Sequence, residues 1–465
     1  MKKRSLCILV LVGWGSLASF LFVFRDTRAL RAEVLQLVSA PEQEVKKNKR
    51  VQTILILPGP HKTGTTTVQA RLSKHFRDGH VAFSNWSWPA PTKAIWEKYA
   101  SNYTDQAELY KETDWTTAKG HAALAFRLHG KQGYMPEIND QFLLDIYRET
   151  LQNDWEAGKN IVIASEELDT LAVEVPKGER QEEWLNNSIS EHKASKVPSF
   201  WSKLLSLLQA TSAPLIRDEP PTIQEVLWDN IYNFLPSHPD IDRRIVVGIF
   251  HRESRSDHLV SLWNEVTQDD NTTTLAEFIY TAEGHKTLLK HNNVLNSFKL
   301  AQVMYESIQV DEIYMLNTAG LERANKDVVV SSLDLIVGCQ MMKVPCHQTS
   351  RGQWYLQGDR KPSRRAEKPP KSNSRVDTST RGLNETTIAT MGTMMRNYDC
   401  QFQSYLPNAD NEKMHYLHFD KPPFADCPNQ PRKGKCGSKV EPAFLPVAEQ
   451  MRRLACEASI DCKVN

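Results

Sequence analysis

"ILILPGPHKTGTTTVQARL", residues 54–72, is the stretch from which the fold of this chain can be predicted. It opens with four apolar residues of the kind found in a buried strand, and a loop of Pro, Gly, Lys and Thr follows. From Thr65 onward the spacing of apolar residues is helical. A strand that leads through such a loop into a helix forms an anion site, because backbone N–H groups and the positive end of the helix dipole face one point.

Short apolar runs recur along the chain and alternate with longer segments that have helical periodicity. Two of them, "IVIA" at 161–164 and "IVVGIF" at 245–250, are continuous, which is typical of strands covered on both faces. We therefore expect an α/β fold with a P-loop-like, doubly wound parallel sheet flanked by helices. The predicted strands are Thr53–Leu57, His80–Phe83, Asn160–Ala164, Arg244–Phe250 and Glu312–Leu316. The predicted helices are Thr65–Phe76, Gln141–Ala157, Phe200–Leu208, Ser256–Val266, Leu275–Ala282, Asn292–Ile308, Thr386–Leu406 and Ala443–Ala458.

The first 50 residues differ from the rest. Three basic side chains in Met1–Arg4 precede 20 residues without a charge, Ser5–Phe24. A helix of that length, at about 1.5 Å per residue, just crosses the roughly 30 Å core of a bilayer. We expect a cytoplasmic tail (1–4), a transmembrane signal anchor (5–24), a charged stem (25–50) and a lumenal domain (51–465). A signal peptide cleaved near Ala18 is the alternative.

The cysteines indicate an oxidising compartment. Seven of the eight lie in the C-terminal part of the chain, which predicts disulfide bonds in a loop-rich region and leaves one thiol free or bonded between chains. Zinc is the competing interpretation, but no CxxC or His-paired spacing supports it. These cysteines are Cys339, Cys346, Cys400, Cys427, Cys436, Cys456 and Cys462. Sequons for Asn-linked glycosylation agree with a lumenal location, at Asn85, Asn102, Asn186, Asn271 and Asn384.

Charge excludes some classes of partner. The formal net charge is +1, so no overall field favours nucleic acid or an acidic membrane surface, and we expect no nucleic-acid partner. Residues 357–383 are basic and nearly free of large apolar side chains, which predicts a flexible, solvated insertion.

The loop differs from the one that binds nucleoside triphosphates, GxxxxGK followed by Ser or Thr. Gly59 and Gly64 have the right separation, but Thr65 stands at the lysine position and Lys62 lies inside the loop. No convincing Walker B aspartate follows an apolar strand. The natural ligand is therefore an anion other than a triphosphate.

"HKTGTTTVQ", residues 61–69, resembles the 5′-phosphosulfate loop of sulfotransferases that use 3′-phosphoadenosine 5′-phosphosulfate (PAPS). The resemblance implies that Lys62 contacts the bridging oxygen of the cofactor and stabilises the departing phosphate. It also implies that the 5′-phosphosulfate is bound by His61, Lys62, Thr63, Gly64, Thr65, Thr66 and Thr67.

The same family places an Arg at the end of a strand and a Ser in the next helix, where they hold the 3′-phosphate. In "IVVGIFHRESRSDHLVSLW", residues 245–263, the matching residues are Arg252 and Ser261. Arg suits this role because its planar fork donates two hydrogen bonds to a phosphate. The separation is nine residues, one more than is usual, which leaves Arg255 as an alternative to Arg252.

"NIVIASEEL", residues 160–168, is similar to a strand that ends in Ser-Glu near the acceptor in carbohydrate sulfotransferases. In-line transfer of a sulfuryl group needs a base for the hydroxyl proton and positive charge for the leaving phosphate. Glu166 is the expected base, with Glu167, His61 and His129 as alternatives. No metal is required, because the cofactor already carries an activated group.

Together these resemblances imply a PAPS-dependent carbohydrate sulfotransferase, a single-pass type II protein of the Golgi membrane that acts on a glycan or glycoprotein. A protein-tyrosine sulfotransferase is the near alternative. A Golgi glycosyltransferase would share the anchor and the α/β class, but its Asp-x-Asp motif should follow an apolar strand, and "DID" at 240–242 precedes one. A lectin or scaffold with a degenerate loop is the non-enzymatic alternative.

Overall fold

Contacts divide the chain into two units, Met1–Arg50 and Val51–Asn465, and the fold described here belongs to the second. Among the described residues no helix is long and apolar enough to cross a membrane, and the predicted anchor, 5–24, lies outside them. The computed structural model describes residues 49–59, 65–128, 134–168, 223–267, 273–282, 284–285, 288, 296–320, 332–350, 353–359, 382–427, 444–459 and 462.

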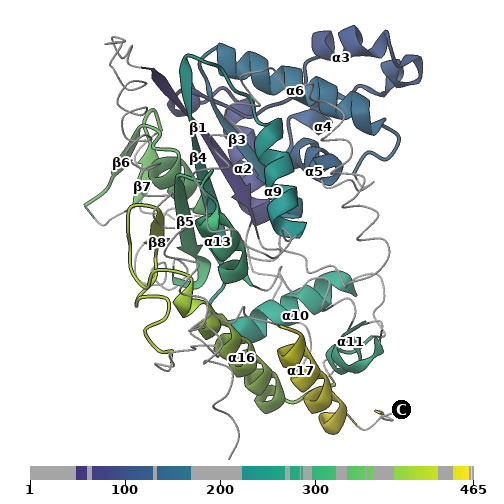
Figure 1. The fold of residues 1–465 in the computed structure, drawn as a ribbon, viewed down its shortest axis with the longest axis vertical. Helices are drawn as coiled ribbons and strands as arrows, with labels where there is room; N and C mark the ends of the chain where they lie inside the picture. The colour runs from purple at the N-terminus through teal and green to yellow at the C-terminus, as the bar shows by residue number, and fades with distance from the viewer. Residues whose placement is uncertain are drawn as a thin grey trace, which may run out of the picture. The chain divides into compact units, whose positions relative to one another are not determined.

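A six-stranded, mostly parallel sheet forms the centre of the molecule, and its strands follow the order β2-β3-β1-β4-β5-β8 (Figure 1). Four of the five predicted strands are present, and the predicted α/β class is confirmed. The strands are β1 (Arg50–Pro58), β2 (Trp86–Ser87), β3 (Asn160–Ser165), β4 (Ile241–His251), β5 (Glu312–Asn317) and β8 (Met414–Leu417).

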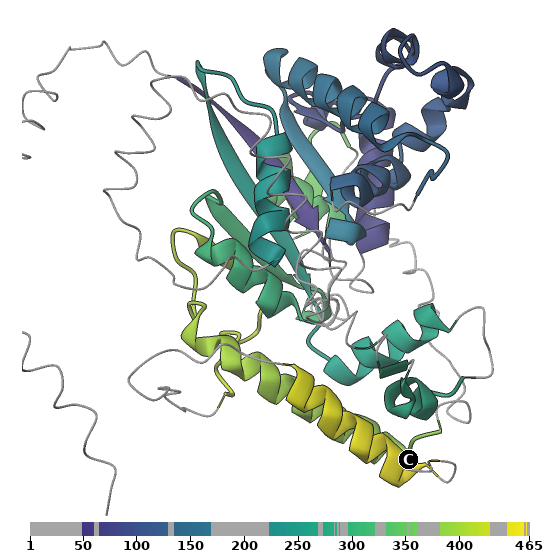
Figure 2. The same cartoon turned by 45° about the vertical axis from the view of Figure 1, so that its right-hand side comes forward.

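The sheet is buried on both faces. Ile54 and Ile56 of β1 belong to one hydrophobic core, whereas Leu55 and Leu57 of the same strand belong to a second. Because successive side chains of a strand point to opposite faces, a strand between two cores must be apolar throughout, as the continuous runs predicted. Figure 2 shows helices on both sides of the strands. The first core includes side chains of α6 (Asp140–Glu156), α9 (Ile223–Phe234) and α13 (Ser297–Glu306), and the second those of α2 (Thr65–Arg77) and α15 (Leu333–Ile336).

Asparagine caps decide where two of the predicted helices begin. Asn296 caps α13, which therefore begins at Ser297 rather than at residue 292. Asn384 caps α16 (Glu385–Asp399), and a separate 3-10 turn at Cys400–Ser404 follows it. The helix predicted at 200–208 lies outside the described residues. The other α-helices in the described part of the chain are α3 (Lys93–Ala100), α4 (Glu112–Trp115), α5 (Ala118–Leu128), α10 (Arg255–Val266), α11 (Leu275–Tyr280) and α17 (Leu445–Ala458).

The strand predicted at His80–Phe83 is wrong. Val81–Phe83 form one turn of 3-10 helix, and the short edge strand β2 comes later, at Trp86–Ser87. Gly79 has a φ of +65° and turns the chain, and the His80 ring then accepts a hydrogen bond from the backbone N–H of Ala82 at 3.2 Å. This side-chain cap stabilises a helical turn where the apolar residues alone indicated a strand.

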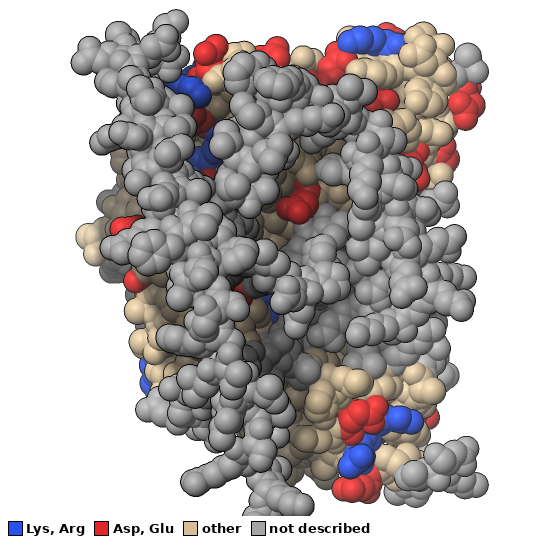
Figure 3. Space-filling view, viewed as in Figure 1, with Lys and Arg blue, Asp and Glu red and all other residues tan. Residues whose placement is uncertain are grey.

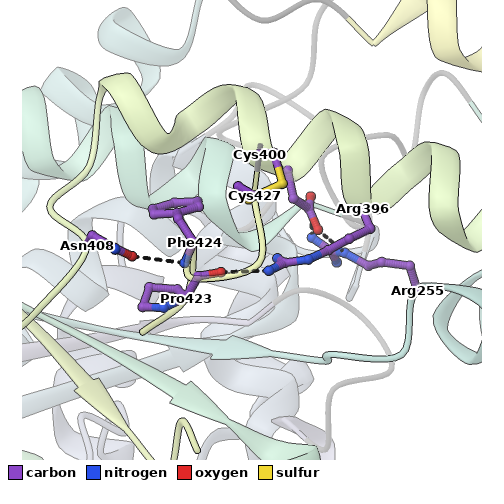
Figure 4. The surroundings of a disulfide bond; sticks show 8 residues. Arg255, Arg396, Cys400, Asn408, Pro423, Phe424 and Cys427 are labelled. Carbon is purple, nitrogen blue, oxygen red and sulfur yellow. Dashed lines mark hydrogen bonds and ion pairs between the residues drawn. A yellow bond between two sulfur atoms is a disulfide. The ribbon is translucent and has the colours of Figure 1, made fainter. Parts of the chain in front are cut away.

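Three disulfides are present in the C-terminal region, which confirms that prediction and excludes zinc ligation by the six cysteines concerned. Cys436 lies outside the described residues. Cys339–Cys346 joins a helical turn to β6 (Cys346–Gln348), which pairs with β7 (Trp354–Leu356) in a small second sheet. Cys400–Cys427 joins the end of α16 to the segment after β8 (Figure 4), and Cys456–Cys462 closes the end of α17.

His121 makes folding stability depend on pH. The ring is fully buried, stacks on Trp88 with centroids 4.2 Å apart, donates from Nε2 to the Pro89 carbonyl and accepts from the backbone N–H of Ala164. Burial lowers the pKa of His121 from 6.5 to about 4. The unfolded chain therefore gains a proton below pH 6.5 that the folded chain does not bind until about pH 4. We expect this residue to remove about 3 kcal/mol of the free energy of unfolding as the pH falls through that window.

Urea unfolding of the protein and of His121→Asn, at intervals from pH 7 to pH 4, measures this contribution. The variant loses the titrating group, so its stability should fall less steeply with decreasing pH, whatever its stability at pH 7. Equal slopes in the two proteins would contradict the prediction.

Candidate functional site

The strand order reverses between β1 and β4. The chain first places β2 and β3 on one side of β1, and then places β4, β5 and β8 on the other side. In open α/β sheets ligands bind outside the carboxyl ends of the strands at such a reversal. Pro58 ends β1 and His251 ends β4, so the two segments that the sequence singled out follow neighbouring strands at this point.

The predicted phosphate loop joins β1 to α2. His61, Lys62, Thr63 and Gly64 lie outside the described residues. The strand before the loop and the helix after it have bounds close to those predicted, and α2 begins with Thr65, Thr66 and Thr67. A helix N-terminus therefore follows the loop directly, at the carboxyl edge of the sheet.

Arg252 and Ser261 lie in contact. Arg252 directly follows β4, and its Nη1 donates a hydrogen bond of 2.8 Å to the Ser261 hydroxyl on α10. Both side chains are partly exposed. The two residues that the resemblance paired across nine positions thus meet in space and leave part of their surfaces for a ligand.

Arg255 has a different environment. It is only 3% exposed, and its Nε and Nη2 donate to the two carboxylate oxygens of Asp399 at 2.6 and 2.7 Å (Figure 4). Because this pair engages the planar fork of the guanidinium and joins α10 to α16, we favour Arg252 over Arg255 as the residue that meets a phosphate.

Glu166 and Glu167 follow β3, the neighbour of β1 on the side away from β4. Ser165 ends the strand, and its hydroxyl accepts a hydrogen bond of 3.2 Å from the backbone N–H of Glu167. Both carboxylates are partly exposed. They lie at the same edge as Arg252, with the end of β1 between them. The alternative base His129, like His61, lies outside the described residues.

A cavity of about 400 Å³ lies beside Arg252, at the carboxyl ends of β4, β5 and β8. One of its walls is His251, whose ring stacks on Phe419 with centroids 5.4 Å apart. Burial, with the nearby guanidinium groups of Arg255 and Arg396, holds the pKa of His251 well below its usual range, so the ring is neutral. The lining residues are His251, Glu253, Asn317, Arg396, Phe419, Asp420, Lys421, Pro422, Pro423 and Asp426.

The sequence did not reveal this cavity. Its outer wall, residues 419–427, follows β8, a four-residue strand without a clear apolar alternation. That wall is attached to α16 in two ways (Figure 4): Arg396 donates to the Pro423 carbonyl at 2.7 Å, and Cys427 bonds to Cys400. Since no sequence spacing encodes which cysteines pair, the wall could not be placed beforehand.

Loss of the Cys400–Cys427 bond should destabilise the fold and loosen the attachment of the cavity wall to α16. The bond closes a loop of 27 residues, which corresponds to about 3.5 kcal/mol of loop-closure free energy. We expect Cys400→Ser/Cys427→Ser to lower the free energy of unfolding by that amount in urea titrations and, on the sequence-based expectation of a PAPS site, to weaken binding of 3′,5′-adenosine bisphosphate.

Cys456→Ser/Cys462→Ser is the matched control, because that bond closes only six residues and touches no lining residue of the cavity. It should cost about 2 kcal/mol and leave binding unchanged. Equal effects of the two double variants on binding would contradict the proposed role of the first disulfide.

The Asp-x-Asp sequence lies at the other end of β4. Asp242 is the second residue of that strand, and Asp240 directly precedes the strand. Both are therefore at the amino edge of the sheet, away from Arg252. A second cavity, of about 250 Å³, also lies at this amino edge, beside Thr53, Asn160 and Arg244. Neither feature is at the carboxyl edge of the sheet, where ligands bind in open α/β sheets.

Charges on the described part of the surface are mixed. Figure 3 shows Lys and Arg interspersed with Asp and Glu on the face that it presents, with the two signs side by side near the C-terminal helices.

No protein-family model, curated protein or solved structure matches this chain. The function must therefore be argued from the residues at the carboxyl edge of the sheet.

Proposed function

We propose that this protein is a PAPS-dependent sulfotransferase with a P-loop-like sheet, and that it transfers a sulfuryl group to a hydroxyl of a glycan. One observation carries the proposal. The strand order puts Glu166, the loop after β1, the Arg252–Ser261 pair and the 400 Å³ cavity in a row along one edge of the sheet.

The row fits a nucleotide with a phosphate on each side of its sugar. Neighbouring strands lie about 4.8 Å apart, so the ends of β3, β1, β4 and β5 span about 14 Å. The loop after β1 and the Arg252–Ser261 pair would supply two separate anion sites, and the cavity beyond them would supply room for the nucleoside. A nucleoside triphosphate, whose phosphates form one chain, has no use for the second anion site.

Each group in the row has one chemical task. PAPS supplies an activated sulfuryl group. Lys62 would neutralise charge on the phosphate oxygen that departs, and Arg252 would fix the 3′-phosphate. Glu166, at the end of β3, would accept the acceptor's hydroxyl proton. The acceptor would therefore approach from the β3 side, opposite the nucleoside cavity.

Disulfides support the proposed compartment. Three of them in one chain are typical of the secretory pathway. This agrees with a single-pass type II protein of the Golgi membrane, in which residues 5–24 form the anchor and the catalytic domain is lumenal.

The full-length protein, purified in detergent, should transfer ³⁵S from labelled PAPS to members of a glycan panel, and EDTA should not reduce the rate. Tyrosine-containing peptides in the same panel test the protein-tyrosine alternative. Transfer of sugar from a UDP-sugar, lost on addition of EDTA, would overturn the proposal in favour of a glycosyltransferase.

A further inference from the structure

Glu253 lies on the wall of the 400 Å³ cavity, one residue after Arg252. Its Oε2 accepts a hydrogen bond of 3.1 Å from Nδ2 of Asn317, the last residue of β5. Arg252 donates in another direction, to Ser261 on α10. A cationic group and an anionic group thus stand side by side at the end of β4, one reaching toward α10 and the other toward β5.

Asn317 holds this carboxylate in place. The residue is only 2% exposed, and because a carboxylate can only accept hydrogen bonds, the amide nitrogen must face Glu253. Gly320 packs against the same amide: a Cβ there would lie 3.2 Å from Nδ2 and would collide with the carbonyl oxygen of His418. The position of the carboxylate is therefore set by buried structure, although Glu253 itself is exposed.

The other charged groups of the cavity wall have partners of their own. Lys421 pairs with Asp426 at 3.3 Å, and Arg396 donates to the Pro423 carbonyl at 2.7 Å. The Glu253 carboxylate is therefore the charged group of this wall that lies nearest to Arg252 along the chain, and a buried amide holds it on the β5 side. Two like unit charges about 4 Å apart repel by about 4 kcal/mol near a protein surface, so a second phosphate would be rejected there.

A neutral hydroxyl, in contrast, would donate a hydrogen bond to this carboxylate. In a nucleotide with a 3′-phosphate, the adjacent sugar carbon carries the 2′-hydroxyl. We propose that Glu253, positioned by Asn317, accepts a hydrogen bond from that 2′-hydroxyl and thereby selects a 3′-phosphate over a 2′-phosphate. This inference rests on the proposed function, and it assigns the residue that reads the sugar.

Competition binding to the full-length protein tests the assignment with three probes: 3′,5′-adenosine bisphosphate, its 2′-deoxy analogue and 2′,5′-adenosine bisphosphate. A hydrogen bond to a charged acceptor is worth about 1.5–3 kcal/mol, so the 2′-deoxy analogue should bind about 10- to 150-fold more weakly than the parent compound. In Glu253→Ala that ratio should approach one. Glu253→Gln should tighten binding of the 2′,5′ isomer at least about tenfold, because the repulsion is removed.

Asn317→Ala should partly reduce the preference for the 2′-hydroxyl over 2′-deoxy and the preference for the 3′,5′ over the 2′,5′ isomer. Glu253 remains in this variant but is no longer held in place. Asp145→Asn, which changes a carboxylate on the surface of α6 outside the cavity wall, should leave both ratios unchanged. If both binding ratios in the two Glu253 variants equalled those of the unaltered protein, the assignment of Glu253 would be overturned, but the proposed function would not. Failure of the unaltered protein to bind any of the three nucleotides would overturn the proposed function and this assignment with it.

Discussion

Lys62→Ala should lower kcat for sulfuryl transfer about 100- to 1,000-fold, the loss usually seen when a group that stabilises transition-state charge is removed. The expected reason is that negative charge grows on the departing 5′-phosphate oxygen as the bond to sulfur breaks, and the ammonium group beside that oxygen neutralises it. Initial rates at saturating labelled PAPS and glycan measure the effect. Binding of 3′,5′-adenosine bisphosphate should weaken much less than the rate falls.

Lys62→Arg is the matched variant for this prediction. It retains the charge but changes its shape, so it should recover part of the lost rate. A Lys62→Ala protein with unchanged kcat would contradict the proposed role of the lysine, whereas a proportional loss of rate and binding would assign it to nucleotide binding only.

Asp399→Ala should lower the free energy of unfolding by about 3–5 kcal/mol, because it leaves a buried guanidinium without its counter-charge. Arg255 and Asp399 are 3% and 1% exposed, and two hydrogen bonds join them across 144 positions of the chain. The pair joins α10, which carries Ser261, to α16, which carries the Cys400 disulfide at its end. Urea unfolding followed by circular dichroism measures the loss.

An exposed ion pair provides the control for that measurement. Asp145 and Arg148 lie 3.0 Å apart on the surface of α6, and Asp145→Ala should cost less than about 1 kcal/mol. A combined Asp399→Leu/Arg255→Met variant removes both buried charges and should recover most of the stability. If Asp399→Ala cost no more than Asp145→Ala, the buried pair would not hold α10 and α16 together.

Residues that lie close together in the sequence could be placed from the sequence. The continuous apolar runs of β1, β3, β4 and β5 predicted the sheet, since a strand buried on both faces has a simple pattern. The approach of Ser261 to Arg252 also follows from local order, because a helix begins three residues after the arginine and carries Ser261 in its second turn.

Contacts between distant segments could not be predicted in the same way. Glu253 meets Asn317 across 64 positions, and Arg255 meets Asp399 across 144, without any periodic signal that links them. The cavity wall depends on β8 and on the choice of cysteine partners. At His80, one side-chain cap outweighed the local apolar pattern. The positions of Arg252, Ser261 and the segment after β1 at the carboxyl edge were therefore predictable in outline, whereas the cavity beside them required the structure.

Binding of 3′,5′-adenosine bisphosphate to the full-length protein, measured by calorimetry with ATP and UDP as competitors, tests the central claim most directly. The account predicts that the bisphosphate binds at least about tenfold more tightly than either competitor, and that Arg252→Ala weakens it about 10- to 150-fold while Arg148→Ala does not. A preference for UDP in the presence of manganese, or bisphosphate binding that is insensitive to Arg252→Ala, would contradict it.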